Sequence, residues 1–145
     1  MKAFKPPSFL CTIAALAILL AGTASAYPTW VRVETLTVDG VANCLPGHPT
    51  VHRSYGAGIY RFTLDLTSPG IQYSGDRPFA ISAFLMLTDN SSTTSDTQTF
   101  GLSQELGIIS EIETSSAGFA ADSFIEDPVC GDNGGNVRIF VDSWQ

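Results

Sequence analysis

A strict alternation of apolar and polar side chains in residues 59–67 limits what this chain can fold into more than any other feature. The apolar positions of this segment, IYRFTLDLT, include Tyr60, Phe62, Leu64 and Leu66. Because successive side chains of a strand point to opposite faces, a period of two predicts a half-buried β-strand that covers these residues.

Strands are also predicted near the two ends of the chain, at residues 30–38 and 137–144. Residues 30–38, WVRVETLTV, are rich in β-branched side chains and end before Asp39-Gly40, a turn signal. Residues 137–144, VRIFVDSW, alternate apolar and polar positions. We expect these segments to be the first and last strands and to lie near one another, as is common in compact domains.

The intervening segments carry weaker signals. Residues 71–73 predict a short edge strand. Residues 79–87, FAISAFLML, are apolar at nearly every position, which favours a central strand covered on both faces, although a buried helix fits the periodicity too. Helical and alternating spacings compete in residues 102–113, where Gly107 and the paired isoleucines favour a strand. Residues 118–124 either extend the sheet or form a short helical turn.

Two stretches predict loops. Residues 42–58 predict a long loop because they are rich in turn-forming residues, namely Pro46, Gly47, Pro49, Gly56 and Gly58. Residues 89–98, DNSSTTSDTQ, lack large apolar side chains, and they predict an exposed, mobile loop tip.

Strands separated by turn signals, with no alternating run of helices, predict an all-β domain. The architecture that fits best is an antiparallel β-sandwich, immunoglobulin-like or related, with about six or seven strands.

Residues 1–26 have the composition of a cleavable signal peptide. Two lysines precede an apolar run at residues 9–21, and Ala24-Ser25-Ala26 supplies an A-x-A cleavage site. The run is too short to cross a bilayer comfortably, and no later segment has membrane length, so a retained anchor is the less favoured alternative. We expect residues 27–145 to form a single secreted domain, extracellular or periplasmic, that begins at Tyr27.

The predicted mature domain is strongly acidic. It contains no lysine, and its five arginines stand against fourteen acidic residues, which gives a net formal charge of −9. A chain of this charge repels phosphate backbones and anionic lipid surfaces at long range. We therefore expect neither nucleic acid nor a membrane surface as a partner.

Cys44 and Cys130 are the two cysteines of the predicted mature domain. An even pair in an exported protein predicts one disulfide bond. Closing so long a loop restricts the unfolded chain by about 4–5 kcal/mol in the chain-entropy model. The bond would tie the loop after the first strand to the approach of the last strand.

Cys44, His48 and His52 have the spacing C-x3-H-x3-H, which is compatible with a zinc site. Pro46 and Pro49 oppose the helix that would place both histidines on one face, and an oxidised Cys44 cannot bind a metal. Ordinary loop histidines are therefore the favoured interpretation.

Oxygen-bearing side chains surround Cys130 in the run EDPVCGDNGGN. Those that could bind calcium are Asp127, Asp132, Asn133 and Asn136. Their spacing matches no EF-hand, and an acidic hairpin turn rich in Asn and Gly has the same composition. The favoured expectation is no cofactor, with calcium as the alternative.

Catalytic machinery is not evident in the sequence. There is no G-x-S-x-G motif, and the two histidines both lie in the predicted loop at residues 42–58. We therefore name no catalytic residue and expect the protein not to be an enzyme. Aromatic side chains that could stack on a sugar or a partner are Trp30, Trp144, Tyr55, Tyr60 and Tyr73, although core packing is the commoner role of aromatics at strand ends.

The leading functional hypothesis is a secreted, non-enzymatic binding domain that recognises an unknown protein or carbohydrate through its loops. The loops expected to bind are residues 54–58, with Tyr55, and residues 89–98, with Asp89 and Asn90. Asn90 also begins an N-x-[ST] triplet, a possible glycosylation site. Two alternatives remain: a structural or envelope-assembly subunit that associates through sheet edges, and a small secreted hydrolase or calcium-dependent carbohydrate binder.

Overall fold

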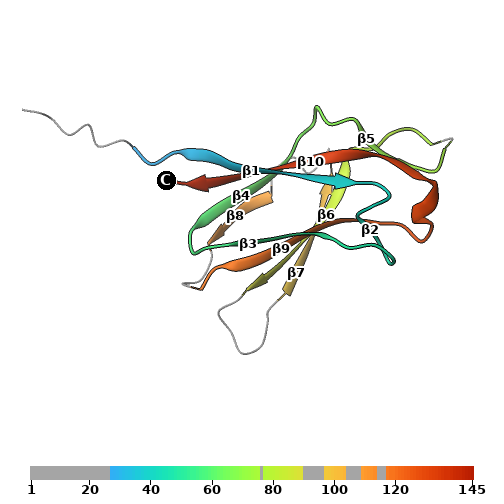
Figure 1. Cartoon of the computed structure of the whole chain (residues 1–145). Coiled ribbons are helices and arrows are strands. Elements are labelled where there is room, and N and C mark those ends of the chain that lie inside the picture. Colours follow the sequence, from blue (N-terminus) through green and yellow to red (C-terminus); the bar gives the residue numbers. More distant parts are fainter. Residues whose placement is uncertain (1–26, 76, 90–96, 104–108, 114–116) are drawn as a thin grey trace, which may run out of the picture.

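Two β-sheets packed face to face make up the computed structural model of the protein (Figure 1). The structure describes residues 27–75, 77–89, 97–103, 109–113 and 117–145. The predicted all-β sandwich is therefore confirmed. The described part contains ten strands, more than the six or seven expected.

The first sheet is antiparallel and has the strand order β1-β10-β4-β8, with β5 also paired to β10. Its strands are β1 (Trp30–Asp39), β10 (Asn133–Trp144), β4 (Ile59–Leu64), β8 (Ile109–Glu113) and β5 (Gly70–Tyr73). The first and last strands are direct neighbours, as the sequence predicted.

The second sheet has the order β2-β9-β6-β7, with β3 also paired to β9. Its strands are β2 (Cys44–Leu45), β9 (Phe119–Glu126), β6 (Ser82–Asp89), β7 (Thr97–Ser103) and β3 (Val51–Tyr55). The short β2 runs parallel to β9, whereas the other described pairs are antiparallel.

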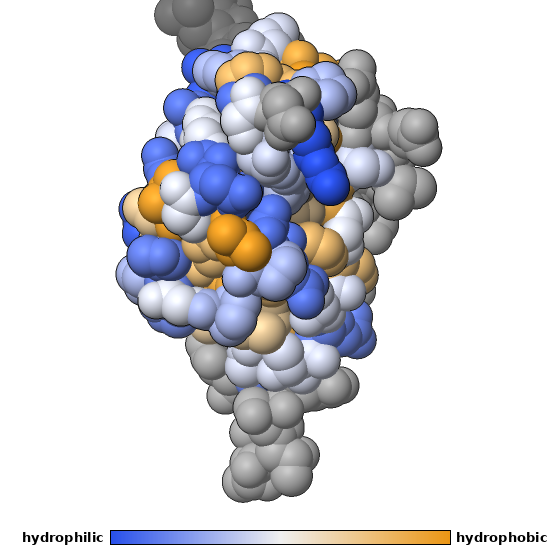
Figure 2. Space-filling model, turned by 90° about the vertical axis from the view of Figure 1, so that its right-hand side faces the viewer, coloured by the Kyte–Doolittle hydropathy of each residue, from blue (hydrophilic) through white to orange (hydrophobic). Residues whose placement is uncertain are grey.

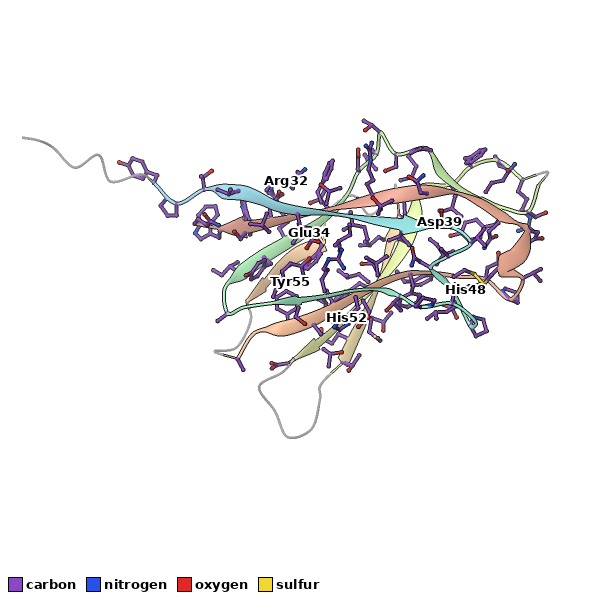
Figure 3. The ribbon with its side chains drawn as sticks, viewed as in Figure 1. Arg32, Glu34, Asp39, His48, His52 and Tyr55 are labelled. Carbon is purple, nitrogen blue, oxygen red and sulfur yellow. A yellow bond between two sulfur atoms is a disulfide. The ribbon has the colours of Figure 1, made fainter. Side chains whose placement is uncertain are left out.

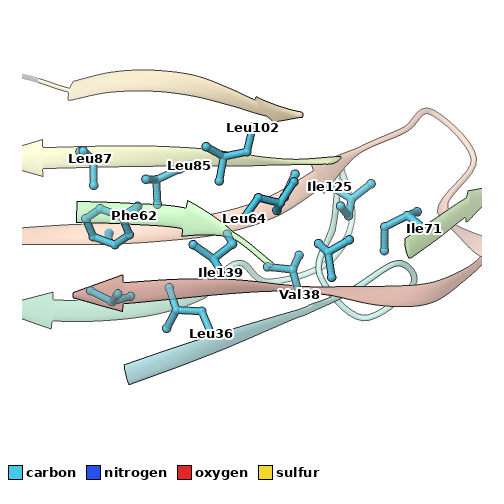
Figure 4. Close-up of a cluster of buried hydrophobic side chains, with 14 of the residues drawn as sticks. Leu36, Val38, Phe62, Leu64, Ile71, Leu85, Leu87, Leu102, Ile125 and Ile139 are labelled. Carbon is cyan, nitrogen blue, oxygen red and sulfur yellow. The ribbon is translucent and has the colours of Figure 1, made fainter. Parts of the chain in front are cut away.

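The core lies between the two sheets and is built from the side chains that point inward from the strands, at every second position along each strand (Figure 4). The first sheet contributes Leu36, Val38, Phe62, Leu64, Ile71, Val137, Ile139 and Val141, and the second contributes Ala83, Leu85, Leu87, Leu102, Phe119, Ala121 and Ile125. Burying these side chains is the main force that holds the layers together.

A disulfide joins Cys44, in β2, to Cys130, in the short 3-10 turn η1 (Cys130–Asp132). This confirms the predicted bond. It connects the segment after β1 with the start of β10, and Cys44 is completely buried.

Gly135 gives β10 the backbone shape that its several partners require. Its φ is +79°, and an added Cβ would lie 2.2 Å from the carbonyl oxygen of Gly70. β10 pairs with β5 from Asn133 to Asn136, a stretch that includes Gly135, and further along it pairs with β4. The Gly-Asn-rich run at residues 133–136, for which the sequence favoured a hairpin turn, is thus the start of β10.

The prediction of one long loop over residues 42–58 is wrong in part, because β2 and β3 lie within it. In the segment VHRSY, residues 51–55, only the two end residues Val51 and Tyr55 pack against the core, while residues 52–54 are exposed. Pro46 and Pro49 fall between the two strands rather than inside them, so they do not interrupt a backbone ladder.

The alternation of residues 59–67 ends earlier than expected. β4 ends at Leu64, and the chain then turns, so that Asp65 is 5% exposed and Leu66 is 50% exposed. The Asp65 carboxylate accepts hydrogen bonds from the backbone N–H and the hydroxyl of Thr67, which fixes this turn.

The uncertain segments are strands where the structure describes them. Residues 82–89 form β6, a central strand whose inward side chains are buried, and this excludes the helical alternative. Residues 119–126 form β9. The segment 102–113 includes the end of β7 and the whole of β8, and residues 104–108 lie outside the described part. Among the described residues, no helix has the length and apolar character needed to cross a bilayer.

The observed end of β4 at Leu64 can be tested by comparing Leu64 with Leu66, because the alternating sequence pattern predicts that both are buried. Leu64→Ala should lower the free energy of unfolding by about 2–5 kcal/mol, because it leaves a cavity in the core. Leu66→Ala should cost less than about 0.5 kcal/mol, because Leu66 is half exposed. Urea unfolding measures both values, and equal losses would contradict the observed end of the strand.

Candidate binding face

Three charged residues lie side by side on the outward face of the first sheet. Asp142, in β10, stands opposite Arg32 of β1 on one side and opposite Arg61 of β4 on the other. We call these three residues the arginine row. They come from three strands that are not consecutive in the chain, and they meet only because β10 lies between β1 and β4.

Both arginines bind the same carboxylate. Arg32 donates from Nε to Oδ1 of Asp142 at 2.5 Å, and Arg61 donates from Nη2 to Oδ2 at 2.8 Å and from Nε at 3.3 Å. The Asp142 side chain is 5% exposed, whereas the side chains of Arg32 and Arg61 are 45% and 32% exposed. The carboxylate is thus covered by the arginines, which remain open to solvent.

Aromatic rings support both guanidinium groups. The Cζ atom of Arg32 lies 3.6 Å from the ring centre of Phe140, and that of Arg61 lies 4.6 Å from the ring centre of Trp30. Trp30 in turn contacts Trp144 edge to face, with 5.1 Å between ring centres. Such cation–π contacts and hydrogen bonds to the carboxylate restrict the arginines to few conformations.

Opposing effects set the acidity of Asp142. Burial raises the pKa of its carboxyl, but hydrogen bonds from Arg61 and Arg32, together with their charges, outweigh burial and hold the pKa below its ordinary value. Asp142 is therefore a stable anion at neutral pH.

A second ion pair lies further along the same face. Arg138 of β10 donates from Nη2 to Oδ2 of Asp65 at 2.7 Å. Burial raises the pKa of Asp65, and the hydrogen bonds from Thr67 and the charge of Arg138 outweigh it, so the net pKa is lowered. Three of the five arginines of residues 27–145 therefore project from this face.

A different polar cluster connects the two sheets. Glu34 of β1 points toward β3, opposite in direction to Arg32, as Figure 3 shows. Its carboxylate accepts hydrogen bonds from Nε of Arg53 at 2.6 Å and from the hydroxyl of Tyr55 at 2.9 Å. Burial, followed by the hydrogen bond to Glu34, raises the pKa of Tyr55 far above its ordinary value. The hydroxyl is thus a fixed donor that joins the layers.

The two histidines lie apart in the fold (Figure 3). His52, on β3, places Nδ1 3.0 Å from Oδ1 of Asp122, which also accepts a hydrogen bond from Thr50. His48 lies between β2 and β3, where its backbone N–H donates to the carbonyl of Cys44. Cys44 itself is oxidised, which removes it from the possible zinc ligands.

The residues proposed for calcium have separate structural surroundings at the disulfide end of the sandwich. Asn133 is buried, and its amide donates to the carbonyl of Gly40. Asp127 accepts the backbone N–H of Val129, Asp132 is exposed in η1, and Asn136 pairs with Asp39 and Gly70 in the sheet. Within the described ranges no three His, Cys, Asp or Glu side chains gather as a metal site. Calcium stays an untested prediction.

Figure 2 views the end of the sandwich that lies at the right of Figure 1. Apolar residues there are scattered among hydrophilic ones instead of forming one continuous patch. Among the exposed apolar residues of the domain, Val41 is 36% and Val129 is 57% exposed. Single exposed apolar residues are normal on a folded protein and do not indicate a docking surface.

The loops predicted to bind a ligand begin at one end of the second sheet. Tyr55 and Asp89 lie on either side of Phe119, the first residue of β9. Tyr55 is half-buried and packs with its ring against Tyr60 and Phe119, so it closes the core at this end. Asn90, the possible glycosylation site, lies outside the described residues. Binding through these loops stays a prediction.

The sequence interpretation did not identify the arginine row. A signal was present, because Arg32, Arg61 and Asp142 are outward positions of three predicted strands. To predict that these three residues are neighbours, one must know that β10 lies between β1 and β4. The alternation of apolar and polar residues gives no information on strand order.

The chain matches no protein-family model and has no significant match among curated proteins or solved structures. The residues of the face itself therefore carry the functional argument.

The charges of the arginine row should make the protein sensitive to acid. Because folding lowers the pKa of Asp142, its contribution to stability is present at neutral pH and is lost as the pH falls below about 4. Asp142→Asn should therefore lose less stability than the wild type between pH 6 and pH 2. Thr35→Ala, an uncharged exposed position on the same face, should keep the wild-type profile. Urea unfolding across this pH range measures the difference, and identical acid profiles for Asp142→Asn and the wild type would contradict it.

Proposed function

We propose that residues 27–145 form an exported, non-enzymatic binding domain whose ligand binds on the outward face of the first sheet. The observation that carries the proposal is the arginine row: two solvent-open guanidinium groups held by one buried carboxylate and stacked on aromatic rings. Arginine and aromatic side chains are the residues most enriched where proteins bind partners strongly.

Export is part of the same proposal. The amino-terminal 26 residues have signal-peptide composition, and the disulfide suits an oxidising compartment. A covalently closed sandwich offers a rigid face, and rigid faces lose little conformational entropy when they bind.

The proposal favours binding over catalysis for a geometric reason. His52 is hydrogen-bonded to Asp122 on the second sheet, away from the arginine row on the first. Among the described residues, the arginine row therefore has no histidine beside it to act as a base.

Binding on the arginine face should be abolished or strongly weakened by Arg61→Ala. The purified domain can be screened against arrayed polysaccharides and peptides, and the affinity of any ligand found can then be measured for the variants. His52→Ala, on the other sheet, should bind like the wild type. A ligand that is unaffected by Arg61→Ala would place the binding surface elsewhere. Turnover of an ester, peptide or glycoside that is lost in His52→Ala would contradict the non-enzymatic assignment.

One observation favours a second candidate function, self-association through a sheet edge. β1 is the terminal strand in the order of the first sheet, and its side chains Val31 and Val33 are 39% and 45% exposed. An exposed edge of this kind can pair with another strand.

Self-association predicts a dimer or larger species in light scattering of the domain at high concentration. Val33→Lys should then return the protein to a monomer, because charged side chains on an edge oppose strand pairing. The matched control Val129→Lys changes an equally apolar, exposed residue in the segment before η1 and should leave the dimer intact. A monomeric wild type at every concentration would exclude this second function.

A further inference from the structure

We infer that the arginine row binds the carboxylate of an acidic sugar, a single uronic-acid-type unit carried on an otherwise neutral glycan. This inference rests on the proposed function and names the ligand class for the same face. It follows from charge, unused hydrogen-bond donors, and the chemistry of the surrounding side chains.

Within the row itself, two guanidinium groups face one carboxylate, so the three residues carry one net positive charge, whereas the neighbouring pair of Arg138 and Asp65 is neutral. The backbone register places two acidic residues, Glu111 and Glu113 of β8, beside the strand of Arg61. Arg32 lies on β1, at the opposite edge of the sheet, so we assign the positive site to Arg32, on a domain whose net formal charge is −9. One additional carboxylate would make the row neutral, so the surplus charge is matched by one acidic group.

Several donors of the row have no acceptor in the described part of the chain. Arg32 bonds to Asp142 through Nε alone, which leaves Nη1 and Nη2, and Arg61 uses Nε and Nη2, which leaves Nη1. Neighbouring N–H groups of guanidinium match the two oxygens of a carboxylate. Because stacking on Phe140 and Trp30 already restricts the arginines, binding loses little side-chain entropy.

The surroundings favour a sugar over a peptide. Outward neighbours of the row include the hydroxyl-bearing Thr35, which is exposed, and Thr63. Trp144 is 41% exposed and packs on Trp30, the ring that supports Arg61. An indole beside charged donors can stack on the apolar side of a sugar ring while the arginines hold its carboxylate.

The net charge of the domain limits how acidic the ligand can be. A polymer with a carboxylate on every unit would place many charges near a surface that is acidic overall, and those charges would be repelled. The Debye length is about 8 Å at physiological ionic strength, so a single carboxylate responds chiefly to the arginine row itself. We therefore expect one acidic unit, not a polyanion.

The two tryptophans of the protein provide a direct measurement, because both belong to this face. In ¹⁵N-labelled protein, their indole N–H signals report any ligand that contacts the face. The probes are cellobiouronic acid, which ends in glucuronic acid, and cellobiose, in which the same carbon carries a neutral hydroxymethyl group.

Cellobiouronic acid should shift the indole signals and bind at least about tenfold more tightly than cellobiose. Its affinity should fall as salt is raised, and Arg32→Lys should weaken it, because lysine keeps the charge but lacks the planar donor pair. Thr99→Ala, an exposed position on β7 of the second sheet, should bind like the wild type. The comparison of the two sugars needs only the wild-type protein, so it holds even if a variant folds poorly.

Three outcomes would overturn the inference. Equal binding of both sugars would show that the carboxylate is not what the arginine row recognises. A neutral ligand would still bind on this face, so the proposed function would remain intact. Equally tight binding of inorganic phosphate, or of an acetylated peptide with a free carboxyl terminus, would remove the sugar class. If the indole signals respond to none of these probes, the assignment of an acidic sugar as the ligand is contradicted. The array screen with Arg61→Ala would then decide separately whether the face binds any ligand.

Discussion

The pairing of β10 with three other strands is the constraint on which the rest of the structure depends. β10 lies between β1 and β4 and also pairs with β5 at its start. Its inward side chains, Val137, Ile139 and Val141, are completely buried, and its outward side chains include Phe140 and Asp142. One strand therefore builds both the core and the candidate binding face. A register shift of one residue would exchange these two sets, so core burial also fixes the position of the arginine row.

The two sheets are joined by different means at the two ends of β9. Cys44 pairs with Ile125 near the end of that strand, and its disulfide to Cys130 is a covalent link to the start of β10. Tyr55 pairs with Phe119 at the beginning of β9, and its hydroxyl reaches Glu34 of the first sheet. The half-buried donor and acceptor satisfy one another there, which avoids the cost of an unpaired polar group. With both ends fixed, the outward faces are held as rigid surfaces.

Local patterns predicted the parts of the fold that local physics determines. Period-two alternation identified β4 and β10 because a half-buried strand requires it, and export chemistry identified the disulfide. The alternation could not show that Leu66 is exposed, since the turn there depends on Asp65 binding Thr67 and Arg138. Nor could it find β3 among prolines, because the partner that stabilises β3 is the distant β9. The arginine row was missed for the same reason, since its members meet only through strand order.

A purely structural role explains the arginine row less well than a binding role does. A buried carboxylate requires compensation, and Arg61 already supplies an opposite charge and two hydrogen bonds to Oδ2 of Asp142. Arg32 then adds a second positive charge, on a side chain that is 45% exposed. Because the carboxylate already has an opposite charge and two hydrogen bonds, Asp142 needs the second arginine less than the first. The second positive charge is instead placed where a ligand can reach it, on a ring-supported guanidinium on the same face as the exposed Trp144, in a domain whose net formal charge is −9.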